Sequence, residues 1–423
     1  MNLQVVQICI TLTSSNLADY TTLNMNGSQQ AAVEVRIKWQ SADASHTEDY
    51  YFDKLNFWRD ILPGNLSMTL PDSAGEWLKD DFAAGELVPS WSRENLHTVK
   101  RKSLRLERRH GPPVELHSGR FYPRTFAAGT AGIFDGDMHP MRVLGMEGDS
   151  VLLDLNHPVA RYPLGVAARI LEHRGHAEEH GGRCNDIVTD VLDGGVGLQA
   201  AMTDGHSGLL DGTKLERLDE REDGLFYSEP RLVQHLDSSA IARVGGIYRR
   251  FLQPGMRVLD FMSSWVSHLP DDLDGVDVTG LGMNVAELEQ NPRLSRHLVH
   301  DANLDPQLPF GDHAFDAVIC TASAEYLVHP VEVFGELARI TKPGGHVVMT
   351  FSDRWFPTKA IGLWSELHPF ERVGLVLDYF RESGRYHNHA THSSRGYPRP
   401  GDDKYADQRV TADPVFAVWA DRT

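Results

Sequence analysis

The stretch LPFGDHAFDAVICTASAEYLVHPVEVFGELARITKPGGHVVMTF, residues 308–351, decides the fold class of this chain. Its apolar run over 315–320 predicts a buried strand, and the apolar spacing over 330–341 predicts a helix. The segment KPGG (342–345) predicts a tight turn into a second strand over 346–351, because proline presets φ and glycine adopts positive φ. Strands that alternate with helices in this way indicate βαβ units and a parallel sheet.

The same alternation extends upstream. Apolar residues at helical spacing over 230–252 predict a helix closed by Pro254 and Gly255, and short apolar runs over 256–261 and 276–281 predict two more strands. Ligands of open α/β sheets bind beyond the carboxyl ends of the strands. Asp260, Asp301 and Thr321, which end or follow predicted strands, are therefore candidates for a binding site.

Several phrases in order, LPF…FDAV, HP…E..R..KPGG and the strand after them, resemble the class I S-adenosylmethionine (SAM)-dependent methyltransferases, of the type 11 kind. The resemblance covers roughly 228–423. It implies a Rossmann-like α/β domain, methyl transfer and SAM as the cofactor. DFMSSW (260–265) with FSDRWFP (351–357) further resembles a branch of these enzymes that lacks the usual glycine loop after the first strand.

In that family the first strand's acid, the loop after it, the end of the second strand and a later acid hold the cofactor. The positions this implies here are Asp260, Met262, Ser263, Ser264, Trp265, Gly282, Met283, Asn284, Asp301, Ala302, Asn303 and Thr321. Two of the family's features are altered. The glycine loop reads FMSSW (261–265), and Gly282 stands where an acid is usual, with Asn284 and Glu287 nearby.

Serine is the next smallest polar residue after glycine, so we expect the Ser263 and Ser264 hydroxyls to bond the SAM carboxylate. Asn284 is expected on a ribose hydroxyl. The alternative is a sheet that kept its fold and lost its cofactor. Methyl transfer depends on positioning, plus a base where the acceptor loses a proton.

Two further groups of residues are predicted around the acceptor, each with a packing role as its alternative. The groups expected to face it are Tyr326, His329, Asp353 and Arg354. The lid candidates, which precede the first strand, are Tyr227, Arg231 and His235.

From 31 to 173 the pattern is instead strand-like, with period-2 alternation in AAVEVRIKWQ (31–40). DLNHP (154–158) resembles a turn of the two-domain bacterial FKBP-type prolyl isomerases (the SlyD type), and the resemblance covers about 31–173. It implies a mainly-β domain with an inserted flap and an aromatic pocket that lowers the barrier to prolyl rotation. The family's Ala-Tyr-Gly reads Ala83-Ala84-Gly85 here, so the alternative is a binding or scaffold domain without isomerase activity.

These patterns divide the chain into four predicted segments: a disordered leader (1–30), an FKBP-like domain (31–174), a linker or lid (175–227) and a methyltransferase domain (228–423). The predicted function is methyl transfer from SAM to an unidentified small-molecule or protein acceptor, with the N-terminal domain recruiting a partner or shaping the active site. The alternatives are a binding protein with a degenerate methyltransferase domain, and a protein that is mainly a prolyl isomerase.

Composition narrows the remaining classes. The chain has 423 residues, 41% of them hydrophobic, enough for two cores, and its formal net charge of −18 argues against a nucleic-acid partner. Scattered cysteines and the lack of a membrane-length apolar run or signal peptide predict a cytoplasmic protein that does not bind a membrane. The patterns GxGxxG for NAD and GxSxG for hydrolases are lacking. Gly181 and Gly182 interrupt the His/Cys spacing over 173–184, which favours solvated histidines over a metal site.

Overall fold

The computed structural model describes residues 29–73, 75–107, 113–177, 180–202, 207–210 and 215–423. The predicted leader therefore lies outside the described residues, except for Gln29 and Gln30, which begin the first strand.

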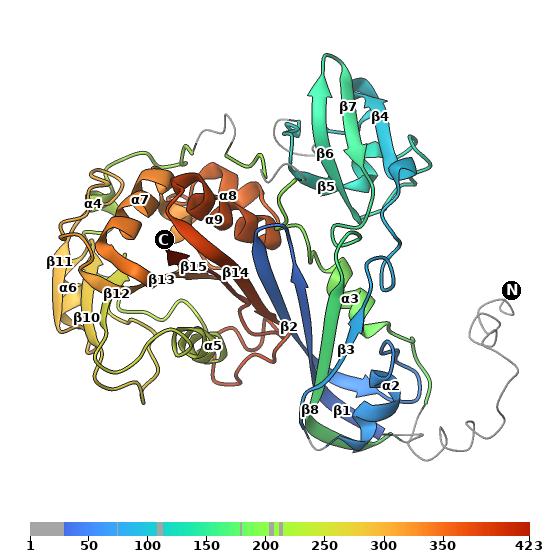
Figure 1. Cartoon of the computed structure of the whole chain (residues 1–423), viewed down its shortest axis with the longest axis horizontal. Coiled ribbons are helices and arrows are strands. Elements are labelled where there is room, and N and C mark those ends of the chain that lie inside the picture. The colour runs from blue at the N-terminus through green and yellow to red at the C-terminus, as the bar shows by residue number, and fades with distance from the viewer. Residues whose placement is uncertain (1–28, 74, 108–112, 178–179, 203–206, 211–214) are drawn as a thin grey trace, which may run out of the picture.

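One sheet of eleven strands runs through most of the molecule, in the order β11-β10-β9-β12-β13-β15-β14-β2-β1-β8-β3 (Figure 1). Its C-terminal strands are β9 (Arg257–Phe261), β10 (Asp277–Gly282), β11 (Arg296–Val299), β12 (Phe315–Thr321), β13 (Thr341–Phe351), β14 (Tyr386–Arg395) and β15 (Val415–Arg422). The first five of these pair in parallel, as the alternation of strands and helices predicts, and β15 runs antiparallel between β13 and β14. The KPGG segment is not a separate turn: β13 already begins at Thr341, and Gly344 adopts φ +73° inside it.

The N-terminal strands extend the same sheet. They are β1 (Gln29–Gln40), β2 (Ala44–Asn56), β3 (Leu78–Phe82) and β8 (Leu164–His176), and they pair with one another antiparallel. The two halves of the sheet meet where β2 pairs in parallel with β14, from His389 opposite Ala44 to Arg395 opposite Tyr50. The two predicted domains thus share one backbone hydrogen-bond network.

A second sheet of four strands, in the order β4-β7-β6-β5, projects from the N-terminal half (Figure 1). Its strands are β4 (Leu96–Lys100), β5 (Phe121–Pro123), β6 (Pro140–Glu147) and β7 (Ser150–Asp154). It has a small core of its own, in which Met141, Val143 and Leu153 are fully buried.

The described α-helices lie beside both halves of the large sheet, the first two beside its N-terminal half and the others beside its C-terminal half (Figure 1). They are α2 (Leu66–Thr69), α3 (Ile187–Asp193), α4 (Asp223–Phe226), α5 (Ser238–Tyr248), α6 (Val285–Glu289), α7 (Pro330–Ile340), α8 (Gly362–Glu366) and α9 (Pro369–Ser383). Helices α7 and α9 belong to the larger hydrophobic core, and α5 belongs to a second core on the other face. Pro330 begins α7, and a capping box of His368 and Glu371 begins α9.

Part of the predicted linker is well packed. Strand β8 reaches His176, and Asp186 caps the buried helix α3 through a hydrogen bond from the Thr189 N–H. Ile187 and Val191 of α3 lie in the larger core beside residues of both halves. Among the described residues, none of the helices has the length and apolar character needed to span a membrane.

Candidate functional site

The carboxyl ends of β9, β10 and β12, together with the residues after β11, open into one pocket of about 1170 Å³ including its mouth. This is the edge of a parallel sheet where ligands are expected. The opposite wall is formed by residues of the segment 215–236, called the strap below, which crosses the pocket before α5 begins.

The loop after β9 adopts a glycine-like conformation without a glycine. Met262 has φ +56°, a left-handed backbone that costs a non-glycine residue about 1–2 kcal/mol. The Ser263 N–H then donates to the Leu281 carbonyl of β10 at 2.7 Å. A Cβ added to the neighbouring Gly282 would lie 2.1 Å from the Ser263 carbonyl oxygen. The backbone of the loop therefore comes close to β10 at Gly282, so the glycine that such an approach needs lies on β10 and not in the loop.

Both loop serines donate to carboxylates of the protein itself. The Ser263 hydroxyl donates to Asp260 Oδ2 at 2.6 Å, and the Ser264 hydroxyl donates to Glu287 Oε2 at 2.6 Å. Asp260 lies beneath the loop and does not line the pocket. Burial raises its pKa to about 6, although hydrogen bonds from Ser263 and Ser267 oppose the shift. Asp260 therefore shapes the loop from below.

Asn284 and Glu287 connect the second strand to the strap. Asn284 caps α6 by accepting from the Glu287 N–H, and its amide group donates to the carbonyls of Tyr227 at 2.8 Å and Ser228 at 3.1 Å. Glu287 Oε1 accepts from the Arg231 N–H at 2.6 Å. The side chain predicted to contact ribose is thus committed to holding the strap.

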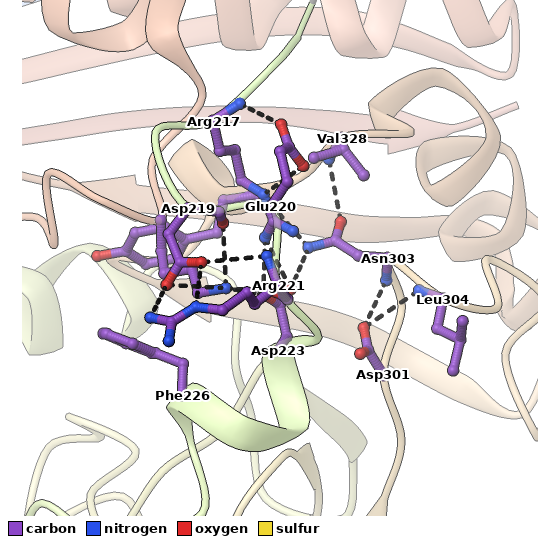
Figure 2. Close-up of polar contacts among 12 residues, drawn as sticks. Arg217, Asp219, Glu220, Arg221, Asp223, Phe226, Asp301, Asn303, Leu304 and Val328 are labelled. Carbon is purple, nitrogen blue, oxygen red and sulfur yellow. Dashed lines mark hydrogen bonds and ion pairs between the residues drawn. The ribbon is translucent and has the colours of Figure 1, made fainter.

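The residues after β11 form a tight turn that faces the pocket. Asp301 Oδ1 accepts from the N–H groups of Asn303 at 2.9 Å and Leu304 at 3.2 Å. Asn303 in turn donates to Asp223 and to the Tyr326 carbonyl, both at 2.9 Å, and accepts from the Val328 N–H (Figure 2). One oxygen of Asp301 is left for a ligand in the pocket.

Asp223 anchors the strap through a buried charge cluster (Figure 2). Arg217 Nη1 lies 2.8 Å from both carboxylate oxygens of Asp223, and Lys359 Nζ lies 3.0 Å from one of them. The Lys359 side chain is fully buried and also donates to the carbonyls of Asp219 and Arg221. Burial opposes the ionisation of Asp223, but hydrogen bonds from Arg217, Asn303 and Lys359 outweigh it and lower its pKa. The cluster fixes the strap above the pocket.

Aromatic rings surround one end of the pocket, with Phe356 at the centre. Its ring centroid lies 5.4 Å from Phe226, 5.3 Å from His235 and 6.1 Å from Tyr326. The Tyr326 hydroxyl accepts from the Phe356 N–H at 2.9 Å, and burial raises the pKa of this hydroxyl well above its usual value. The Tyr326 hydroxyl therefore stays protonated at neutral pH.

His268 is a pocket residue that the sequence patterns do not point to. It follows the loop after β9 with φ +53°, and its buried Nδ1 has no hydrogen-bond partner among the described residues. Burial lowers its pKa to about 4, and the nearby His235 adds to the shift. A neutral imidazole with a free nitrogen therefore lines the pocket at physiological pH.

The structure brings most of the predicted site together. All predicted cofactor positions except Asp260 line the pocket, as do Tyr326 and the three lid candidates. The other three predicted acceptor-facing residues lie outside it and contact other side chains: His329 lies 3.6 Å from Glu332, Asp353 lies 3.4 Å from Arg409 and Arg354 lies 3.1 Å from Asp413.

Several pocket residues escaped the sequence patterns: Asp223, His268, His300 and Phe356. In the sequence, the acidic and aromatic residues of DGLFY (223–227) were the feature that could have indicated the strap. Among the described residues, no group of three His, Cys, Asp or Glu side chains is placed to hold a metal ion.

Comparison with known proteins identifies the region around the pocket. Residues 261–349 match the family described as a methyltransferase domain. This match bears out a methyltransferase domain over part of the predicted segment 228–423.

The similar curated proteins are methyltransferases. A demethylmenaquinone methyltransferase of Renibacterium salmoninarum is 33% identical over 97 residues, which are 23% of this chain and 41% of that protein. A ubiquinone/menaquinone biosynthesis C-methyltransferase of Burkholderia cenocepacia is 25% identical over 156 residues, 35% of this chain and 63% of that protein. A solved SAM-dependent methyltransferase of Thermotoga maritima covers 44% of this chain and 90% of its own, at 15% identity and a TM-score of 0.33. The chain thus spans less than two thirds of each curated relative.

Proposed function

We propose that this protein is a SAM-dependent methyltransferase that binds its cofactor in the pocket at the carboxyl edge of β9, β10 and β12. The observation that carries the proposal is the pocket itself, which gathers Ser263, Gly282, Asp301 and Thr321 from four successive strand ends. The match of 261–349 to a methyltransferase domain supports it.

The residues present fit this cofactor. Gly282, which lines the pocket, lets the loop after β9 lie close to β10, and the strap closes the opposite side. The polar groups that would hold SAM are the backbone of the 262–264 loop and the Asp301 carboxylate, whose second oxygen is available. Bound there, SAM would supply an activated methyl group. The protein's own part is to orient the acceptor and exclude water.

We further propose that the acceptor carries a flat aromatic ring. The Phe356, Tyr326 and His235 rings at one end of the pocket suit stacking with such a ring. The printed names of the curated relatives, a demethylmenaquinone methyltransferase and a ubiquinone/menaquinone C-methyltransferase, support a quinol among the aromatic acceptors. His268, a neutral imidazole in the pocket lining, is the proposed base for an acceptor that loses a proton.

The test is methyl transfer from SAM labelled in its methyl group to demethylmenaquinol. The wild type is expected to label the quinol. His268→Gln is expected to lower kcat by about 10²–10⁴-fold, the usual contribution of a general base, while the Kd for SAM stays unchanged. His329→Gln, which alters a histidine outside the pocket, is the matched control. Equal activity of both variants would reject His268 as the base.

A second candidate function rests on the loop contacts. Because Ser263 and Ser264 donate to Asp260 and Glu287, and Asn284 donates to the strap, the polar groups replacing the family's glycines and acid are already satisfied. This arrangement favours a binding protein with a degenerate methyltransferase site. It predicts that SAM causes no heat of binding in calorimetry.

For the remainder of the chain we propose the boundaries 31–174, 175–227 and 228–423, with an FKBP-like N-terminal domain that recruits a partner or substrate. The projecting sheet and the DLNHP turn support it. Asn156 bonds Asp154 and both backbone groups of Ser92, which suits a structural turn. Isomerisation of an X-Pro peptide by the full chain would show prolyl isomerase activity. If the peptide is not isomerised, a binding role for this domain is favoured.

A further inference from the structure

A second hollow lies between α5 and the sheet strands β1, β2, β8 and β14. Its charged lining consists of Glu34, Asp49, Arg169, Arg243, Arg250 and His392. Arg243 comes from α5, Arg250 lies in the turn just after this helix ends at Tyr248, and the other four come from the strands. This hollow, called the arginine groove below, is separate from the pocket described above and shares no residue with it.

The two carboxylates of the groove are already neutralised. Glu34 Oε2 accepts from Arg169 Nε at 2.7 Å. Asp49 accepts from Arg36 through both oxygens, at 2.6 and 2.8 Å, and from His392 at 3.0 Å. Each acid is therefore already paired with an arginine other than Arg243 and Arg250.

Arg243 and Arg250 form no ion pair with any residue that the structure describes. Arg243 Cζ lies 3.2 Å from the centroid of the Tyr397 ring, and Arg250 has a long contact of 3.4 Å with His392 Nδ1. Burial lowers the pKa of both guanidinium groups, and the nearby carboxylates offset this shift only in part. In a chain of net charge −18, this is a local excess of positive charge that an anion would offset.

The floor of the arginine groove is open between the two arginines, of which Arg243 lies on α5 and Arg250 lies two residues beyond its end. Gly246 lies between them on the groove, and a Cβ added there would meet nothing within 4 Å. The floor is thus open, and long arginine side chains can reach toward each other over it.

We propose that the arginine groove binds a small multivalent anion of the diphosphate class, held between the guanidinium groups of Arg243 and Arg250. Arginine presents paired N–H donors that match phosphate oxygens. A diphosphate offers one phosphoryl group to each arginine, which a single carboxylate does not. The proposal is independent of methyl transfer.

The test is calorimetric titration of the full chain with inorganic pyrophosphate at constant ionic strength, and with ADP as a second probe. Binding at submillimolar concentration is expected, and Arg243→Gln and Arg250→Gln are each expected to raise the Kd at least tenfold. Arg249→Gln is the matched control, since Arg249 is the C-cap residue of α5 and pairs with Asp272. Tighter binding of ADP than pyrophosphate would assign the diphosphate to a nucleotide, and equal binding would assign it to a free diphosphate.

A second variant keeps the test valid if removal of an arginine disturbs folding. Gly246→Leu retains both charges and should abolish binding by filling the groove. Absence of binding to the wild type, or equal affinity in Arg249→Gln, Arg243→Gln and Gly246→Leu, would overturn the proposal.

Discussion

At the scale of single residues, the pocket depends on where the backbone comes close without a Cβ. Met262 takes the left-handed conformation itself, and Gly282 accommodates the Ser263 carbonyl. Two residues therefore do what the usual glycine loop does: Met262 adopts the left-handed backbone conformation, and Gly282 on the neighbouring strand allows the close approach.

Gly282→Ala is expected to be destabilising and to abolish SAM binding. Its Cβ would lie 2.1 Å from the Ser263 carbonyl oxygen, so the loop must move, and overpacking of this kind costs about 1–3 kcal/mol. Denaturant unfolding and SAM titration measure both effects. Gly311→Ala, where a Cβ meets nothing within 4 Å, is the control. Unchanged SAM affinity in Gly282→Ala would contradict the assigned role.

Glu325 makes a pH-dependent contribution to stability. It is buried below the pocket wall, neither of its carboxylate oxygens has a hydrogen-bond partner among the described residues, and burial raises its pKa to about 8 from 4.5. A raised carboxyl pKa stabilises the folded state fully below the unfolded value of 4.5 and loses this contribution as the pH rises through 8.

The free energy of unfolding of the wild type, relative to Glu325→Gln, should therefore fall by up to about 1.4 kcal/mol per pH unit between about pH 5 and 8. Other buried acids affect both proteins alike and cancel in the difference. Urea unfolding at several pH values measures it, with Glu289→Gln, an exposed acid, as the control. A pH-independent difference would show that Glu325 ionises normally.

At the scale of elements, the strap is the part of the site that is held by charge. Asp223 forms ion pairs with Arg217 and Lys359. Asn284 and Glu287 form hydrogen bonds with the strap backbone from the sheet side. The strap thus owes its position to partners on the sheet edge.

Asp223→Ala is expected to cost about 3–5 kcal/mol of stability, because it removes the nearest carboxylate from the buried Lys359 and from Arg217. SAM affinity should fall with it, since Asp223, Tyr227 and Arg231 line the pocket. Glu222→Ala, an exposed neighbour, should change neither quantity. Chemical denaturation and SAM calorimetry on the two variants provide the comparison. Wild-type stability in Asp223→Ala would mean that the charge cluster does not hold the strap.

The sequence predicted elements better than contacts. The buried parallel strands β9, β10 and β12 are short apolar runs bounded by turn and polar residues, so their carboxyl edge could be located in advance. The partners of Ser264 and Asn284 could not, because Glu287 and the strap reach them through tertiary packing. His329 was wrongly predicted to face the acceptor for a similar reason. Its position at the start of α7 follows from the local sequence, but the direction of its side chain depends on how α7 packs.

At the scale of the whole molecule, the parallel pairing of β2 with β14 makes one sheet of segments that lie more than 300 residues apart along the chain. No local pattern predicts such a pairing. Buried residues of α3 join the same core from the segment between the two halves. We therefore expect the two halves to unfold in one cooperative transition, and a ligand of one half to stabilise both.

The most direct test of the account is thermal denaturation of the full chain with and without SAM, repeated on Asp301→Ala and on Asp271→Ala, an exposed acid outside the pocket. At about 100 times its Kd, a ligand adds about 2.7 kcal/mol to the stability of the state that binds it. The account predicts a single transition that SAM raises in the wild type and Asp271→Ala, and raises much less in Asp301→Ala. A transition that SAM leaves unmoved in the wild type would contradict it.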